Sequence, residues 1–209
     1  MLNELEAETY HALERGYSAN PIVHAFQDTA HHFDITTVLL KPFFASMRTD
    51  LTAKTFTQQQ YQDYIYGSAE VVGLMCLKVF CNGNQARYDH LQAGASKLGA
   101  AYQKVNFLRD IAQDHTDLGR MYFPGVQFED FDEAQKTAII EDIEADFAAA
   151  LPYMRQLPKG AKSAVLASYR YYNALLIKLK QTPVQTIKTK RVRISNARKV
   201  ALLLKPGKA

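Results

Sequence analysis

The most informative stretch of this 209-residue sequence runs from Leu98 to Pro124, LGAAYQKVNFLRDIAQDHTDLGRMYFP. An α-helix turns by about 100° per residue, so the side chains of this stretch can be sorted into faces. One face collects apolar side chains and the opposite face collects amides and carboxylates. The polar side chains that fall within about 60° of one another are those of Gln103, Asn106, Asp110, Asp114 and Asp117. The sequence therefore predicts a helix with one packed face and one polar stripe.

Two carboxylates of this stripe, Asp110 and Asp114, are four residues apart and so lie side by side on a helix. Each raises the proton affinity of the other unless a cation sits between them. Oxygen ligands of this kind suit Mg²⁺, which is usually shared with substrate phosphate. A solvated acidic surface is the alternative, but such faces are mostly rich in Lys and Glu, whereas this one uses Gln, Asn and Asp. We favour a metal and phosphate site here.

Helical spacing of apolar residues extends over the rest of the chain. We therefore predict an all-α fold in which residues 1–209 form a single bundle of about eight helices. The ranges that predict helices are Leu2–Arg15, Pro21 to about His32 after an Asn20 cap, Thr36 to Leu51 with a kink at Pro42, Thr57–Cys81, Gln85–Thr116, a helix capped by Asp130 or Asp132 that runs to Leu151, Lys162–Lys180, and a last one after Ser195.

The composition excludes several classes of protein. With 47% hydrophobic and 22% charged residues the chain is typical of a globular domain. The most apolar run, residues 71–80, is too short to span a membrane and contains Lys78. The first ten residues are acidic, which is unlike an export signal, and two cysteines exclude a disulfide framework. We expect a cytoplasmic protein.

Positive charge is concentrated at the end of the chain. Residues 178–209 contain ten Lys and Arg and no acid, whereas residues 1–177 carry an acidic excess. This basic tail could be a solvated surface helix, or it could contact an anionic membrane or a polyphosphate. Nucleic acid is the weaker alternative, because no recognition motif and no interleaved aromatic residues accompany the bases.

The Leu98–Pro124 stretch resembles the second aspartate-rich motif of the squalene and phytoene synthase family. Two further segments resemble that family, so the likeness covers about residues 20–204. The upstream segment is Tyr64–Gly73, and the downstream one comprises Tyr172, Arg191-Val192 and Lys199. The residues that match the motif in order are Ala100 or Ala101, Gln103, Asn106, Leu108-Arg109-Asp110, Asp114 and Gly119-Arg120-Met121-Tyr122-Phe123-Pro124.

The resemblance implies an isoprenoid-synthase-like bundle that condenses two prenyl diphosphates head to head through a cyclopropylcarbinyl diphosphate. Phytoene from geranylgeranyl diphosphate is the favoured product, and squalene or dehydrosqualene from farnesyl diphosphate is the alternative. By carry-over, Asp110 and Asp114 would bind Mg²⁺, with Mn²⁺ as the alternative ion. The implied substrate-binding residues are Gln103, Asn106, Arg120, Tyr122 and Arg191, and the implied catalytic residues are Tyr64, Tyr172 and Arg109.

The sequence also departs from the family pattern. Family enzymes carry a first aspartate-rich motif upstream of the regions matched here, and this chain contains no such run. Glu70 and Ser68 stand where the family has Gly and Val, and Gln113 stands where an acid is common. We therefore expect an N-terminally incomplete family member whose activity on its own is impaired. A non-catalytic relative that acts as an assembly or binding protein is the contrasting interpretation.

Overall fold

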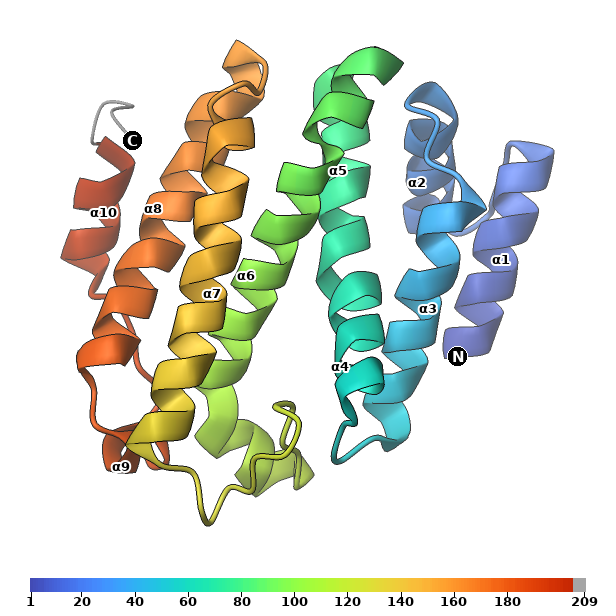
Figure 1. Cartoon of the computed structure of the whole chain (residues 1–209). Coiled ribbons are helices and arrows are strands. Elements are labelled where there is room, and N and C mark those ends of the chain that lie inside the picture. Colours follow the sequence, from blue (N-terminus) through green and yellow to red (C-terminus); the bar gives the residue numbers. More distant parts are fainter. Residues whose placement is uncertain (205–209) are drawn as a thin grey trace.

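A computed structural model describes residues 1–204 and shows an all-helical fold with no strand among them (Figure 1). The helices succeed one another across the molecule from α1 at one edge to α8 and α10 at the other, and chain neighbours pack together. Their bounds are α1 Leu2–Arg15, α2 Pro21–His32, α3 Thr37–Thr52, α4 Gln58–Ile65, a π-helix η1 Tyr66–Glu70, α5 Val71–Cys81, α6 Gln85–Leu118, α7 Glu133–Met154, α8 Lys159–Gln181, α9 Val184–Ile187 and α10 Asn196–Leu204.

The predicted helix boundaries are largely confirmed, because they rest on local signals. Gly16 ends α1 in the left-handed conformation with φ of 71°. The Asn20 side chain accepts hydrogen bonds from the backbone N–H groups of Ile22 and Val23 and so caps α2. Asp132, rather than Asp130, begins α7 through a reciprocal capping box with Gln135.

The long helix predicted over Thr57–Cys81 is confirmed, since the chain is helical from Gln58 to Cys81, but it contains a π turn that the sequence did not predict. A π-helical turn, η1, separates α4 from α5, and π turns are rare and often lie beside functional sites. The interruption coincides with two close backbone approaches. A side chain at Gly67 would overlap the Pro42 carbonyl of α3, and a Cβ at Gly99 of α6 would lie 2.6 Å from the Ala69 carbonyl oxygen. These contacts join residues of different helices, so the spacing of residues within one helix does not predict them.

The stretch Gln58–Cys81 is also long and apolar enough to cross a membrane by length and composition. In this fold it contributes to the interior. Tyr61, Ile65 and Val71 are buried, and the stretch packs against α3 and α6. Core helices of globular proteins commonly pass the same test, so we treat this stretch as part of the bundle.

The long helix α6 organises the fold and carries the polar stripe. It packs against η1, α5, α7 and α8. Its apolar face, which includes Ala101, Val105 and Leu108, is fully buried in the largest core cluster. The opposite face is therefore held in a fixed orientation by the packing of the first.

The basic tail is anchored to the core, and this corrects the view of it as a solvated helix throughout. A short helix, α9, which the sequence did not predict, begins the segment. Four apolar side chains of the segment are buried in the main core, namely those of Val184, Ile187, Val192 and Ile194. Beyond them, Ser195 caps α10 by accepting from the backbone N–H of Arg198 at 3.4 Å. The tail residues 205–209 lie outside the described part.

Candidate functional site

The structure places the predicted polar stripe on one side of α6. Gln103, Asn106, Asp110 and Asp114 are all partly exposed, whereas the residues behind them are buried. Asp117, the fifth member, is fully exposed near the end of the helix, where Gly119 adopts a left-handed conformation. The stripe that the sequence predicts is thus present as a continuous polar surface.

Asp110 is surrounded by two arginines from different parts of the chain. Arg109 donates from Nε to Oδ1 at 2.9 Å and from a terminal nitrogen to Oδ2 at 2.5 Å. Arg191, in the segment after α9, approaches Oδ1 through Nε at 2.7 Å and Oδ2 through a terminal nitrogen at 3.3 Å. The basic tail therefore returns to the stripe, and it brings a cation to the carboxylate that the sequence assigns to metal binding.

Asp114 has a different environment from Asp110. Burial, together with the neighbouring Asp110 carboxylate, raises the pKa of its carboxyl to about 6. Arg120, Arg109 and Arg191 act in the opposite direction on this pKa, but they do not outweigh burial. A carboxylate whose ionised form is disfavoured in this way would gain from a bound cation.

Tyr172 of α8 lies across from Asn106. Its hydroxyl donates to Oδ1 of Asn106 at 3.3 Å. Its ring stacks on that of Tyr102, with centroids 4.0 Å apart and planes inclined by 20°. Tyr172 thereby links the stripe to α8, and its aromatic face stands beside the predicted substrate-binding amides.

Arg120, Tyr122 and Tyr64 occupy the interior beneath the stripe. Arg120 is 7% exposed and donates to the Asp50 carboxylate at 3.1 Å, to the Asp50 carbonyl at 2.7 Å and to the Tyr122 hydroxyl at 2.8 Å. Tyr64 donates to the same Asp50 carboxylate at 2.8 Å. These contacts tie the end of α3 to the segment after α6. A substrate-binding or catalytic role for the three residues stays a prediction.

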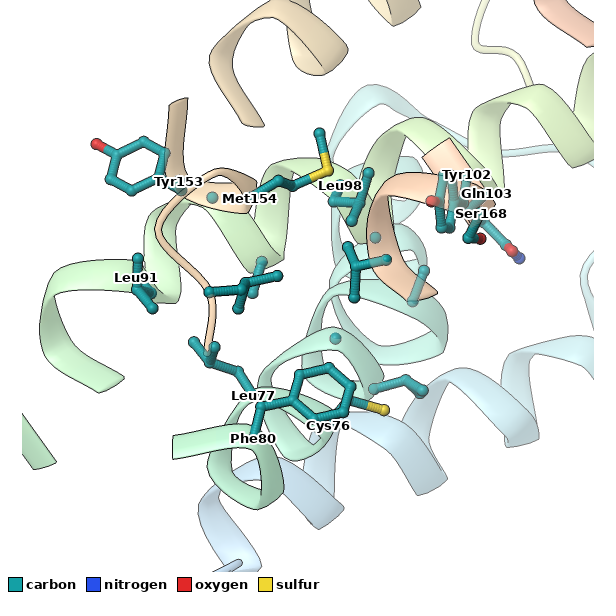
Figure 2. Close-up of a pocket in the computed structure, with 18 of the residues that line it drawn as sticks. Cys76, Leu77, Phe80, Leu91, Leu98, Tyr102, Gln103, Tyr153, Met154 and Ser168 are labelled. Carbon is teal, nitrogen blue, oxygen red and sulfur yellow. The ribbon is translucent and has the colours of Figure 1, made fainter. Parts of the chain in front are cut away.

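A cavity of about 360 Å³ opens beside the stripe, between α5, α6 and the facing ends of α7 and α8. Its volume is within the range of small-molecule sites, about 300–1,000 Å³. Figure 2 shows Gln103, Tyr102 and Ser168 at one end of it, and Tyr153 and Leu91 at the other. The remaining lining is apolar or small, including Val72, Gly73, Leu77, Phe80, Ala95, Leu98, Gly99, Met154 and Val165. The polar stripe therefore meets an apolar channel at Gln103.

The hydroxyl of Ser68, in the wall of this channel, is buried without a hydrogen-bond partner. An unsatisfied buried hydroxyl costs about 1–3 kcal/mol, so polar atoms of a ligand or water would stabilise this end of the channel. Sequence reasoning missed Tyr102, Tyr153 and the channel itself. The available signal was the set of small residues at Gly73, Gly94 and Gly99, where helix backbones approach closely.

The residues of the stripe fit a divalent cation that is shared with a substrate. Among residues 1–204 no group of three or more His, Cys, Asp and Glu side chains converges on one point. The Asp110 and Asp114 pair would therefore supply only part of a coordination shell, which suits Mg²⁺ bound jointly by carboxylates, water and substrate phosphate. The electrostatic destabilisation of ionised Asp114 is consistent with such an ion.

Comparison with protein families matches residues 1–198 to the squalene/phytoene synthase family. Over 130 residues the chain is 29% identical to the 4,4′-diapophytoene synthase of Staphylococcus haemolyticus. The aligned region covers 62% of this chain and 43% of that protein. It is 24% identical over 218 residues to a 15-cis-phytoene synthase of Paracoccus sp., covering 97% of this chain and 69% of the relative. The match thus spans less than half of the Staphylococcus protein.

Solved structures show the same fold. A dehydrosqualene synthase in complex with a ligand superposes with a TM-score of 0.78 at 22% identity, covering 97% of this chain and 75% of that chain. A squalene synthase from Alicyclobacillus acidocaldarius gives a TM-score of 0.74 at 19% identity, covering 86% of this chain and 72% of the other. The all-α, isoprenoid-synthase-like fold expected from the sequence is confirmed.

Proposed function

Because the chain belongs to the squalene/phytoene synthase family, we propose that its polar stripe and apolar channel bind prenyl diphosphates for head-to-head condensation. The observation that carries this proposal is the junction at Gln103, where a carboxylate and amide surface meets an apolar channel of about 360 Å³. A prenyl diphosphate has the same division into a polyanionic head and an apolar chain. Geranylgeranyl diphosphate, giving phytoene, is our preferred substrate, and farnesyl diphosphate is the alternative.

The diphosphate end of the site is formed by α6 and the tail. Asn106 and Gln103 carry amide N–H groups that can donate to diphosphate oxygens, and Arg191 brings a guanidinium to the same face. Asp110 and Asp114 would hold Mg²⁺. When bound, this ion supplies positive charge that stabilises the departing diphosphate. We propose that Arg191, which pairs with Asp110 in this structure, moves to the diphosphate when substrate binds.

The condensation begins when the allylic carbon–oxygen bond breaks and the diphosphate leaves with the electron pair. The double bond of the second prenyl chain attacks the resulting cation, and loss of a proton closes the cyclopropane ring. Tyr102 lines the polar end of the channel and Tyr172 stacks on its ring, so this aromatic pair can stabilise a cation there. The apolar lining beyond them would exclude water from it. In this proposal Arg109 orients Asp110, since it donates to both carboxylate oxygens.

The test is calorimetric binding of a non-reactive prenyl thiodiphosphate with and without Mg²⁺. Replacing Asp110 and Asp114 together by Asn should abolish the Mg²⁺-dependent part of the affinity, whereas Asp89→Asn, which removes an exposed carboxylate near the start of α6, should not. Unchanged affinity in the double variant would refute the metal assignment. Incubation with geranylgeranyl diphosphate and Mg²⁺ measures turnover, which we expect to be slow because one carboxylate pair neutralises only part of the charge of two diphosphates.

An assembly or binding protein without catalysis is the second candidate. It is favoured by the pairing of Asp110 with two arginines, which leaves the carboxylate neutralised in this structure. The two candidates differ in the binding experiment, because a protein that has lost the reaction would not need Mg²⁺ to bind the thiodiphosphate.

A further inference from the structure

The channel is bounded by two helices that run antiparallel in close contact. Gly99 of α6 faces the Ala69 carbonyl, and Gly73 of α5 faces the Ala95 carbonyl, with a Cβ at Gly73 placed 2.9 Å from that oxygen. As α5 advances away from Ser68, α6 therefore runs back from Gln103 towards Leu91. Lining residues from both helices follow this order, so the channel is elongated along the helix axes.

The two ends of the channel differ in chemistry. The near end has hydroxyls and an amide, from Ser68, Tyr102, Ser168 and Gln103. The far end is apolar and lies between Leu77 and Phe80 of α5, Leu91 of α6, and Tyr153 at the end of α7 (Figure 2). A prenyl chain whose diphosphate lies on the stripe would point its tail towards this far end.

Tyr153 reaches the far end because Gly94 has no side chain. A Cβ at Gly94 would overlap the Cβ of Tyr153 and would lie 2.6 Å from its Cγ. Next to it, a ring nitrogen of His90 is 2.8 Å from Oε1 of Gln156, so the preceding turn of α6 is also tied to the segment just after α7. Tyr153 is thereby held against Gly94 and closes the far end of the channel; we call this closed end the floor.

The distance along α6 from the proposed diphosphate position to this floor can be compared with the lengths of extended prenyl chains. From Asn106, which is level with the proposed diphosphate, to Gly94, against which Tyr153 packs, the helix rises by about 18 Å. A fully extended C20 chain is about 19 Å long and a C25 chain about 24 Å, at about 1.25 Å of advance per carbon–carbon bond of about 1.5 Å. We infer that Tyr153, seated on Gly94, sets the upper limit of chain length in this channel and that this limit lies at about C20. The inference rests on the proposed function.

The experiment measures the affinity of the full chain for C10, C15, C20 and C25 prenyl thiodiphosphates with Mg²⁺ present. For the unaltered protein, each C5 unit up to C20 should tighten binding by about tenfold or more, because it buries further apolar surface, and C25 should bind no tighter than C20. In Tyr153→Ala the floor is removed, and C25 should bind about tenfold tighter than C20.

Two further variants complete the design. Tyr153→Phe keeps the ring and removes only the hydroxyl, so it should retain the limit of the unaltered protein. Ala95→Leu obstructs the channel about 17 Å from Asn106 along α6, so it should bind C10 and C15 as before and lose the gain from C20. Circular dichroism and thermal unfolding establish that each variant is folded, and if Ala95→Leu is not, the two Tyr153 variants decide the result.

The outcomes separate this inference from the proposed function. If no prenyl thiodiphosphate binds to any variant, the proposed function fails. If binding occurs and C25 gains as much as C20 in the unaltered protein, the tail leaves through the open side of the channel, where Val72 and Cys76 are exposed, and the role of Tyr153 is refuted. An unchanged length limit in Tyr153→Ala refutes it equally.

Discussion

Asp110 and Asp114 lie one helical turn apart in unequal environments. Asp110 is compensated by Arg109 and Arg191, whereas burial and the Asp110 charge raise the pKa of Asp114 to about 6. The ionised form of Asp114 is therefore less stable in the folded chain than in the unfolded chain, where an Asp has a pKa of about 3.9. In the absence of a divalent cation this group reduces stability at neutral pH.

A prediction about pH dependence follows for the metal-free protein. The folded state retains the Asp114 proton to higher pH than the unfolded state does, so this contribution to stability is present below about pH 4 and is lost as the pH rises through about 6. We expect Asp114→Asn to raise the free energy of unfolding by about 1–2 kcal/mol at pH 7.5 and by nearly nothing at pH 4. Urea unfolding at both pH values measures this.

Asp117→Asn is the matched control, because Asp117 is exposed on the same helix and should change stability little at either pH. Added Mg²⁺ should reduce the difference between the Asp114 variant and the unaltered protein. Equal stability of the Asp114 variant and the unaltered protein at pH 7.5 without metal would contradict the proposed destabilisation by ionised Asp114.

The helices α6 and α7 are joined by ionic contacts around the buried Lys104 and Asp146, on the side of α6 away from the channel. Lys104 donates to Asp142 at 2.5 Å and to Asp146 at 2.7 Å, and Lys97 donates to Asp146 at 2.9 Å. Asp146 is 4% exposed. These contacts fix the face of α6 that lies opposite the stripe, and so they help to orient the stripe towards α8.

We expect Lys104→Met to lower the free energy of unfolding by about 3 kcal/mol, because removing one partner leaves the buried Asp146 poorly compensated. The double variant Lys104→Met/Asp146→Leu should recover most of this loss, since a buried ion pair can be replaced by apolar side chains. Lys180→Met, which breaks an exposed pair with Glu144 on the same α7, should cost about 0.5 kcal/mol. Similar losses in both single variants would contradict the importance of the buried contacts.

At the scale of the whole molecule, the basic tail is anchored to the core by buried apolar side chains and exposes its basic side chains to solvent. Val192 and Ile194 are buried, while Lys190, Arg193 and Arg198 between and beyond them are exposed. Prenyl substrates and products are lipids, so a protein of this family would benefit from peripheral contact with an anionic bilayer. Each base near such a surface adds about 1 kcal/mol, which salt screens.

We predict that the protein cosediments with vesicles that contain anionic lipid and that high salt releases it. Replacing Lys190, Arg193 and Arg198 by Gln should reduce pelleting several-fold while it leaves the buried anchors in place. The control replaces three exposed bases outside the tail, Lys41, Lys54 and Lys159, by Gln and should pellet as the unaltered protein does. If both triple variants pellet equally, membrane contact does not depend on the tail.

The lack of the first aspartate-rich motif is expected to impair activity. This remains a prediction, because nothing in the structure of residues 1–204 tests it. The features that the sequence did not predict are of one kind. The π turn η1 and the anchoring of the tail both involve contacts between elements, Gly67 with α3 and Ile187 with the main core. Periodicity in one segment carries no information about such contacts.

The sequence by itself determined the all-α fold, the cap at Asn20, an aspartate cap at Asp130 or Asp132, and the polar stripe from Gln103 to Asp114. These features follow from the fixed rotation of 100° per residue within one helix and from hydrogen bonds between residues close in sequence. Tertiary structure alone decided that Arg191 meets Asp110 and that Tyr153 closes a channel over Gly94. Those pairs join residues far apart in the chain, and their proximity depends on how the helices pack, which the spacing within any one helix does not specify.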